Sequence, residues 1–134
     1  MRILSGIDIV EIDRIGKSID RQGDAFINRV FTHDEQEYCN RLTGIRRMES
    51  YAARFAAKEA AGKALGTGIM AEGISLTDIG IINDVKGAPR LSLTGKARQK
   101  ADDYGVFDMS LSLSHDGGYA IAVCSMLAEG GEPS

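Results

Sequence analysis

The fold of this chain is decided by residues 55–68, which read Phe-Ala-Ala-Lys-Glu-Ala-Ala-Gly-Lys-Ala-Leu-Gly-Thr-Gly. The run predicts the second half of a long helix from about Glu49 to Leu65, which Gly66 ends. Because most of its side chains are alanine, the helix is thin and its face is open. Glu59 and Lys63 stand four residues apart, so an acid and a base lie one turn apart on the same helix face.

The segments on either side of this helix predict short helices before it and mostly strands after it. Thr32 with Glu35 three positions later matches a capping box, which marks a helix start. The alternation of apolar and polar residues over 107–114 is the clearest strand signal in the chain. We expect strands at 3–10, 79–83, 90–93, 107–114 and 119–125, helices at 11–21, 33–42, 49–65 and 94–104, a basic loop at 44–47 and a tight turn at 115–118.

These elements predict an α+β fold, in which a small, largely antiparallel sheet packs on one long helix and several short ones. A chain of 134 residues favours one domain with a modest core. We expect this single domain to span residues 1–125 and residues 126–134 to form a flexible C-terminal tail.

Composition and charge exclude several classes of protein. Hydrophobic residues make up 43% of the chain and charged residues 26%, and no apolar run is long enough to span a membrane. The net charge of −3 argues against a general nucleic-acid binder. Since the N-terminus does not resemble a secretory signal, we expect a cytoplasmic protein whose two cysteines are reduced thiols. Most Lys and Arg residues precede residue 68, which suggests one cationic patch for an anionic ligand or an acidic partner.

Asp8 is the first candidate for chemistry because it interrupts the apolar run of residues 7–10. Alone it is most simply a solvent-facing strand residue, and Glu59 with Lys63 is most simply a surface ion pair. Brought together, two carboxylates and a lysine would hold a divalent cation and the phosphates that it carries. Mg²⁺ suits such a site, since it binds one or two carboxylates and completes its octahedron with phosphate and water. No cluster of Cys and His favours zinc.

Other candidates surround this combination. Arg54 and Lys58 are like charges four residues apart, so an anion between them would relieve their repulsion. His115 follows the strand at 107–114 and is equally compatible with a plain turn residue and with a functional one. Its neighbour Asp116 is a natural turn residue before glycine.

Three segments together resemble the signature blocks of the 4′-phosphopantetheinyl transferases, and their order and spacing are similar to the short bacterial group, the holo-acyl-carrier-protein synthases. The segments are Gly6–Arg14, Arg54–Gly68 and Ser112–His115. The middle one is the most specific, and the resemblance extends over residues 1–123. It implies that the hydroxyl of a serine on apo acyl carrier protein attacks the β-phosphate of coenzyme A. Phosphopantetheine is transferred and 3′,5′-ADP leaves, giving the holo carrier protein used in fatty acid biosynthesis.

The resemblance also implies roles for residues of this chain. Asp8 and Glu59 would hold Mg²⁺ with the pyrophosphate oxygens, and Lys63 would stabilise or protonate the leaving phosphate. Which carboxylate or water accepts the serine proton stays open, as does any part for Asp116. The residues implied to contact coenzyme A are Arg54, Lys58, Lys63 and His115, the last near the nucleotide.

The family further implies a homotrimer with active sites between neighbouring subunits. A sheet covered on one face only would leave an apolar face that trimerisation could bury. Arg14, Lys17 and Arg21 on the first helix resemble the surface that docks the acidic carrier protein.

Two other functions remain open from the residues. A Mg²⁺-dependent phosphohydrolase or nuclease also uses Asp, Glu and Lys, although such sites commonly place Glu and Lys two apart on a strand. In a non-enzymatic oligomeric binding module, Asp8 and Glu59 would lie far apart in space.

Overall fold

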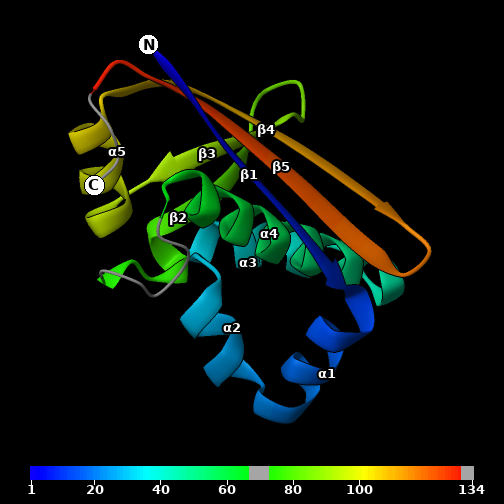
Figure 1. Ribbon diagram of the computed structural model, residues 1–134. Helices are drawn as coiled ribbons and strands as arrows, with labels where there is room; N and C mark the ends of the chain where they lie inside the picture. Colours follow the sequence, from blue (N-terminus) through cyan, green and yellow to red (C-terminus); the bar gives the residue numbers. More distant parts are fainter. Residues whose placement is uncertain (67–72, 131–134) are drawn as a thin grey trace.

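The computed structural model describes residues 1–66 and 73–130, and Figure 1 shows its helices and strands. The predicted α+β class is confirmed. Along the chain the elements are β1 (Arg2–Glu11), α1 (Ile12–Gln22), α2 (Asp24–Val30), α3 (His33–Asn40), α4 (Gly44–Ala64), the short 3-10 helix η2 (Leu76–Asp78), β2 (Ile79–Asn83), β3 (Pro89–Leu93), α5 (Gly95–Tyr104), β4 (Val106–Asp116) and β5 (Tyr119–Ala128).

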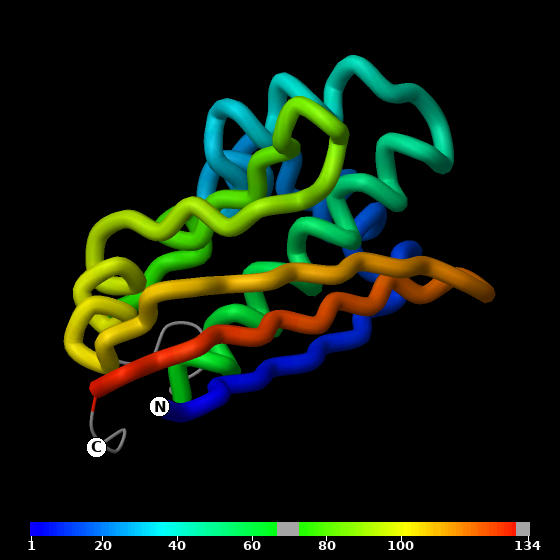
Figure 2. The backbone as a smooth tube through the Cα atoms, turned by 90° about the horizontal axis from the view of Figure 1, so that it is seen from above, coloured from blue at the N-terminus to red at the C-terminus, as the bar shows by residue number. Residues whose placement is uncertain are grey.

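The described strands form two antiparallel sheets, where the sequence predicted one. The larger sheet has the order β1-β5-β4, and β2 pairs with β3 in a separate hairpin. Helix α4 lies against one face of the larger sheet, with α1, α2 and α3 on that side (Figure 1), and the β2–β3 hairpin lies beyond the β4 edge of the sheet (Figure 2). Within the described residues, no element covers the opposite face of the sheet. None of the described helices is long and apolar enough to cross a membrane.

Strand β1 packs directly on α4 because both elements present small residues where they meet. Ala60 is fully buried and Ala64 nearly so. A Cβ atom built on Gly6 would lie 1.9 Å from the carbonyl oxygen of Ala60, so only glycine permits this approach. Leu4 is buried on the same strand face, and residue 8 belongs to that face as well. Asp8 therefore faces the helix, and its simplest interpretation as a solvent-facing strand residue is wrong.

The N-terminal half differs from the prediction at two places. Helix α4 begins at Gly44, so the basic loop expected at 44–47 is the first turn of the helix. Helix α2 was not predicted, because its seven residues are too few for a clear period. The capping box at Thr32 and Glu35 is present as predicted.

The C-terminal hairpin is longer than predicted at both ends. Strand β4 continues through His115 and Asp116, which leaves Gly117 and Gly118 as the turn. Strand β5 runs to Ala128, and Met126 and Ala128 are buried. The prediction of a flexible tail from residue 126 is therefore wrong for residues 126–128, which complete the sheet.

Candidate active site

Asp8 and Lys63 meet where β1 crosses the C-terminal half of α4. The Lys63 ammonium lies 3.1 Å from Asp8 Oδ1 and donates a second hydrogen bond, of 3.0 Å, to the carbonyl of Ile7. The Asp8 side chain is 18% exposed and that of Lys63 is 53% exposed. The close packing at Gly6, two residues before Asp8, holds this part of β1 against the helix.

Glu59 lies one helix turn before Lys63 and lines a cavity together with Asp8. The cavity has a volume of about 340 Å³, and its lining includes Asp8, Glu59, Phe55 and Arg14. Burial raises the pKa of Glu59, the charge of Asp8 raises it further, and Lys63 lowers it. Two carboxylates that repel across a shared cavity favour a cation between them. Asp8 and Glu59, which the sequence predicted to lie together, both line this cavity.

The donor set fits Mg²⁺ better than a metal held by protein ligands alone. Among residues 1–66 and 73–130, no group of three or more His, Cys, Asp or Glu side chains gathers as a metal site. Asp8 and Glu59 would thus supply two oxygen ligands and leave the other positions to phosphate and water, as Mg²⁺ accepts. Lys63 lies beside Asp8, where it could contact a phosphate bound to a metal at the two carboxylates.

Lys58 points into the protein and not into this cavity. Its side chain is fully buried, its ammonium lies 2.7 Å from Glu35 Oε1, and it donates to the carbonyls of Leu76 and Ile79. The sequence predicted that an anion would relieve the repulsion between Lys58 and Arg54. For Lys58, the carboxylate of Glu35 is such an anion. This position contradicts the expectation that Lys58 contacts a phosphate of coenzyme A.

Arg54 lies one turn before Lys58 and borders a different cavity. It is 5% exposed, donates to Ser50 and to Asn83 at 2.9 and 2.7 Å, and stacks on the ring of Tyr38 at 4.2 Å. Its Nε is buried and has no hydrogen-bond partner. The cavity, of about 210 Å³, is also lined by Arg41 and by the carboxylates of Asp34 and Glu37, so its wall carries charges of both signs.

His115 occupies a third position, at the end of β4. Its Nδ1 lies 3.4 Å from Glu49 Oε2, on the first half of α4. His115, Glu49 and Asp116 line a cavity of about 560 Å³ beside the β4–β5 turn, and neither Asp8 nor Glu59 lines it. One chain therefore distributes the predicted ligand-binding residues over separate cavities.

The predicted docking residues are exposed on α1. Arg14, Lys17 and Arg21 recur at helical spacing, and Arg14 also borders the cavity of the two carboxylates. A partner that binds this helix would therefore lie next to that cavity.

Sequence reasoning missed several residues that shape these sites. Glu35 was recognised as a helix-capping residue, but its pairing with Lys58 could not be read from spacing, because 23 positions of the chain separate them. The partners of Arg54 and His115, which are Asn83 and Glu49, lie on other elements and carry no local signal.

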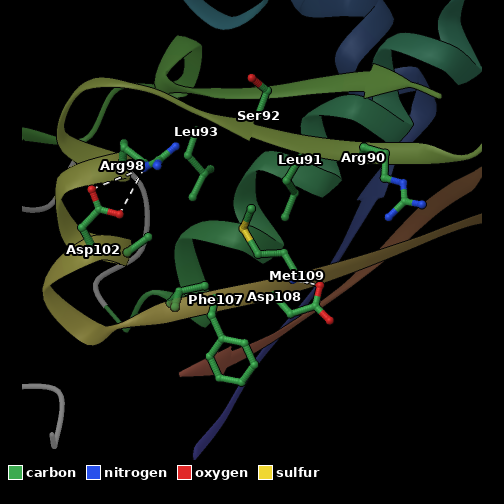
Figure 3. A pocket seen from close by; sticks show the side chains of 11 residues that line it. Arg90, Leu91, Ser92, Leu93, Arg98, Asp102, Phe107, Asp108 and Met109 are labelled. Carbon is green, nitrogen blue, oxygen red and sulfur yellow. Dashed lines mark hydrogen bonds and ion pairs between the residues drawn. The ribbon is translucent and has the colours of Figure 1, made fainter. Parts of the chain in front are cut away.

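A further cavity lies between β3, α5 and β4, as Figure 3 shows. None of the predicted site residues lines it. Its two arginines already have carboxylate partners, Arg98 with Asp102 and Arg90 with Asp84. Neither arginine of this cavity is therefore left without a carboxylate partner.

Comparison with known proteins identifies the family. The model of the 4′-phosphopantetheinyl transferase superfamily matches residues 5–124. The chain is 46% identical over 123 residues to the holo-(acyl-carrier-protein) synthase of Ruminiclostridium cellulolyticum, with 91% of this chain and 90% of that protein covered. It is 48% identical over 117 residues to the synthase of Trichlorobacter lovleyi, with 87% and 90% covered.

Solved structures give the same result. The holo-(acyl-carrier-protein) synthase of Helicobacter pylori, in complex with coenzyme A, matches with a TM-score of 0.80 and 37% identity, over 92% of this chain and 100% of that chain. The synthase of Bacillus anthracis, solved with coenzyme A as 3′,5′-ADP, matches with a TM-score of 0.77 and 36% identity, over 94% and 96%. With the family model covering most of its length, this chain belongs to the 4′-phosphopantetheinyl transferase superfamily.

Proposed function

We propose that this chain is a holo-acyl-carrier-protein synthase, which transfers 4′-phosphopantetheine from coenzyme A to a serine of apo acyl carrier protein. The observation that carries the proposal is the cavity shared by Asp8 and Glu59, with Lys63 beside Asp8. Relatives with this name at 46% and 48% identity support the reaction class.

The reaction requires one bond to form and one to break at the β-phosphorus of coenzyme A. The serine oxygen bonds to phosphorus, the bond to the bridging pyrophosphate oxygen breaks, and 3′,5′-ADP leaves with that oxygen. A bound Mg²⁺ would neutralise the charge that develops on the phosphoryl oxygens.

The chain's own residues would position the reactants and move the proton. Asp8 and Glu59 supply the metal's carboxylate ligands, and the Lys63 ammonium, 3.1 Å from Asp8, turns to the leaving phosphate. The serine proton passes to a carboxylate or to a water that it orients. As the family resemblance implies, Arg54 would contact a phosphate of coenzyme A and His115 would lie near its nucleotide.

The proposal includes a homotrimer with active sites between subunits. Ile3, Ile7 and Ile9 are 71%, 60% and 57% exposed on the open face of the larger sheet, and exposed apolar side chains on one face are typical of an interface. Association through this face would let the Arg54 and His115 cavities of one subunit complete the carboxylate cavity of another. A cytoplasmic location stays a prediction from the sequence.

The carrier protein would dock on α1. Its acidic surface would meet Arg14, Lys17 and Arg21 and bring the substrate serine to the neighbouring cavity.

Mass spectrometry of apo acyl carrier protein after incubation with this chain, coenzyme A and Mg²⁺ tests the proposal. We expect the carrier protein to gain one phosphopantetheine group, and the Glu59→Gln variant to give no gain. An unmodified carrier protein with free phosphate released from coenzyme A would instead indicate a phosphohydrolase.

A further inference from the structure

Lys58 and Glu35 form a buried ion pair on the side of α4 that packs on β2. Both side chains have no exposed surface, and their charged atoms lie 2.7 Å apart. Burial lowers the pKa of Lys58, and the carboxylate of Glu35 opposes that effect. Removing two charges from water is costly, so their other contacts indicate why the pair is there.

Both charged groups also bind the backbone of residues 76–81. The Lys58 ammonium donates to the carbonyls of Leu76 and Ile79 at 3.1 and 2.7 Å, which together with Glu35 gives it three acceptors for its three protons. Glu35 Oε2 accepts from the amide of Ile81 at 2.7 Å. The pair therefore fixes η2 and the first half of β2 through carbonyls and amides alike.

The same strand forms part of the Arg54 cavity. Asn83, two residues beyond Ile81, accepts a 2.7 Å hydrogen bond from Arg54, and Ile81 and Asn83 both line the cavity into which Arg54 faces. Arg54 and Lys58 stand one turn apart on α4, so β2 is tied to the helix at two successive positions. A shift of β2 would move Asn83 and release the guanidinium of Arg54.

We infer that Lys58 and Glu35 are positioning residues for the site that binds a phosphate of coenzyme A at Arg54. The inference rests on the proposed function. Neither residue touches the substrate; the pair holds β2 so that Asn83 orients Arg54. It acts on binding and leaves the Asp8–Glu59 cavity, on the β1 side of α4, unchanged.

The Glu35→Gln variant tests this role, with 3′,5′-ADP and Mg²⁺ as separate probes in titration calorimetry. Losing a hydrogen bond from a charged donor weakens binding by about 10- to 100-fold, so we expect 3′,5′-ADP to bind more weakly by a factor of that size. The KM for coenzyme A should rise by a similar factor, with little change in kcat or in Mg²⁺ affinity. The control is Asp102→Asn, which removes the exposed ion pair with Arg98 and should change none of these values.

Exchanging the charges of Glu35 and Lys58 distinguishes a positioning role of the pair from the stability that any ion pair would give. In the double variant Glu35→Lys with Lys58→Glu, the pair is kept, but a carboxylate now faces two carbonyls and an ammonium faces the amide of Ile81. We expect neither 3′,5′-ADP affinity nor melting temperature to recover. The inference is overturned if the exchange restores both, or if Glu35→Gln binds 3′,5′-ADP as the wild type does.

Amide hydrogen exchange on the unaltered protein covers the case in which these variants do not fold. Saturating 3′,5′-ADP should slow exchange at Ile81 more than at Val10 of β1, because the ligand stabilises the segment that the pair holds. Equal slowing at both amides overturns the inference. A wild-type protein that binds neither 3′,5′-ADP nor coenzyme A would instead refute the proposed function.

Discussion

Replacing Gly6 by alanine should separate the two carboxylates of the candidate metal site. The added Cβ would lie 1.9 Å from the carbonyl oxygen of Ala60 and 2.7 Å from the amide nitrogen of Ala64. The shortest carbon–oxygen contacts that recur in proteins are about 3.3 Å, so β1 and α4 must move apart by at least about 1.4 Å. Both obstacles are backbone atoms, which cannot turn aside as a flexible side chain would.

This displacement acts directly on Asp8, which lies two residues further along the same face of β1. Overpacking of this kind costs about 1–3 kcal/mol of folding free energy. A displacement of about 1 Å can reduce catalysis about a hundredfold, so we expect a fall of that size in kcat/KM together with weaker Mg²⁺ binding. Urea unfolding, Mg²⁺ titration and the rate of carrier-protein modification measure the three effects.

Gly16→Ala provides the matched control. A Cβ at Gly16 would lie 3.5 Å from the sulfur of Met48, an ordinary contact, and alanine is favoured over glycine inside a helix by up to about 1 kcal/mol. This variant should be at least as stable as the wild type and bind Mg²⁺ normally. If Gly6→Ala also retained wild-type stability and Mg²⁺ affinity, the idea that close packing of β1 on α4 builds the metal site would be refuted.

The remaining predictions concern the carboxylates, the docking helix and the open sheet face. Glu59→Gln and Asp8→Asn should each abolish transfer while the fold survives, and full activity of either with coenzyme A and Mg²⁺ would rule out the metal assignment. Without metal, Glu59→Gln should also melt at a higher temperature near neutral pH. Because the pKa of Glu59 is raised, the folded chain holds this proton more tightly than the unfolded chain, so wild-type stability falls as pH rises through that raised pKa. The gain should vanish in acid, where Glu59 is protonated in both states, and a gain that persists there contradicts the assigned cause. Arg14→Glu should impair use of the carrier protein far more than binding of coenzyme A, and added salt should act in the same direction; equal losses would exclude docking on α1. Ile7→Lys should prevent formation of the proposed trimer, since it places a charge among exposed apolar side chains, and a trimer mass by light scattering for this variant would show that this face is not the interface.

The fold was predictable where a local pattern carries the information. Period-two alternation located β4, and the Thr32–Glu35 box located the start of α3. The predictions that were wrong concern segments whose structure depends on tertiary contacts. The first turn of α4 is polar and reads as a loop, and the end of β5 is ordered because Met126 and Ala128 are buried against the rest of the chain.

The candidate site was predictable to the same extent. Each of Asp8, Glu59 and Lys63 has a simpler interpretation when taken alone, and they could be grouped because three segments of the chain together resemble the signature blocks of one family. No local signal indicates which way β1 faces, and the answer came from Gly6, whose lack of a side chain lets the Asp8 face approach α4.

Lys58 explains why adjacent residues of one motif can have opposite roles. Successive helix residues differ by about 100° in direction, so Lys58 faces β2 while its neighbour Glu59 faces the cavity that it shares with Asp8. A linear motif therefore mixes residues that hold the scaffold with residues that meet the substrate. In this chain the two faces of α4 differ, with Lys63 and the proposed metal ligand Glu59 toward β1, and Arg54 with its hydrogen-bond partner Asn83 toward β2. A single subunit cannot bring those two faces together, which is the physical reason to expect that neighbouring subunits complete each site.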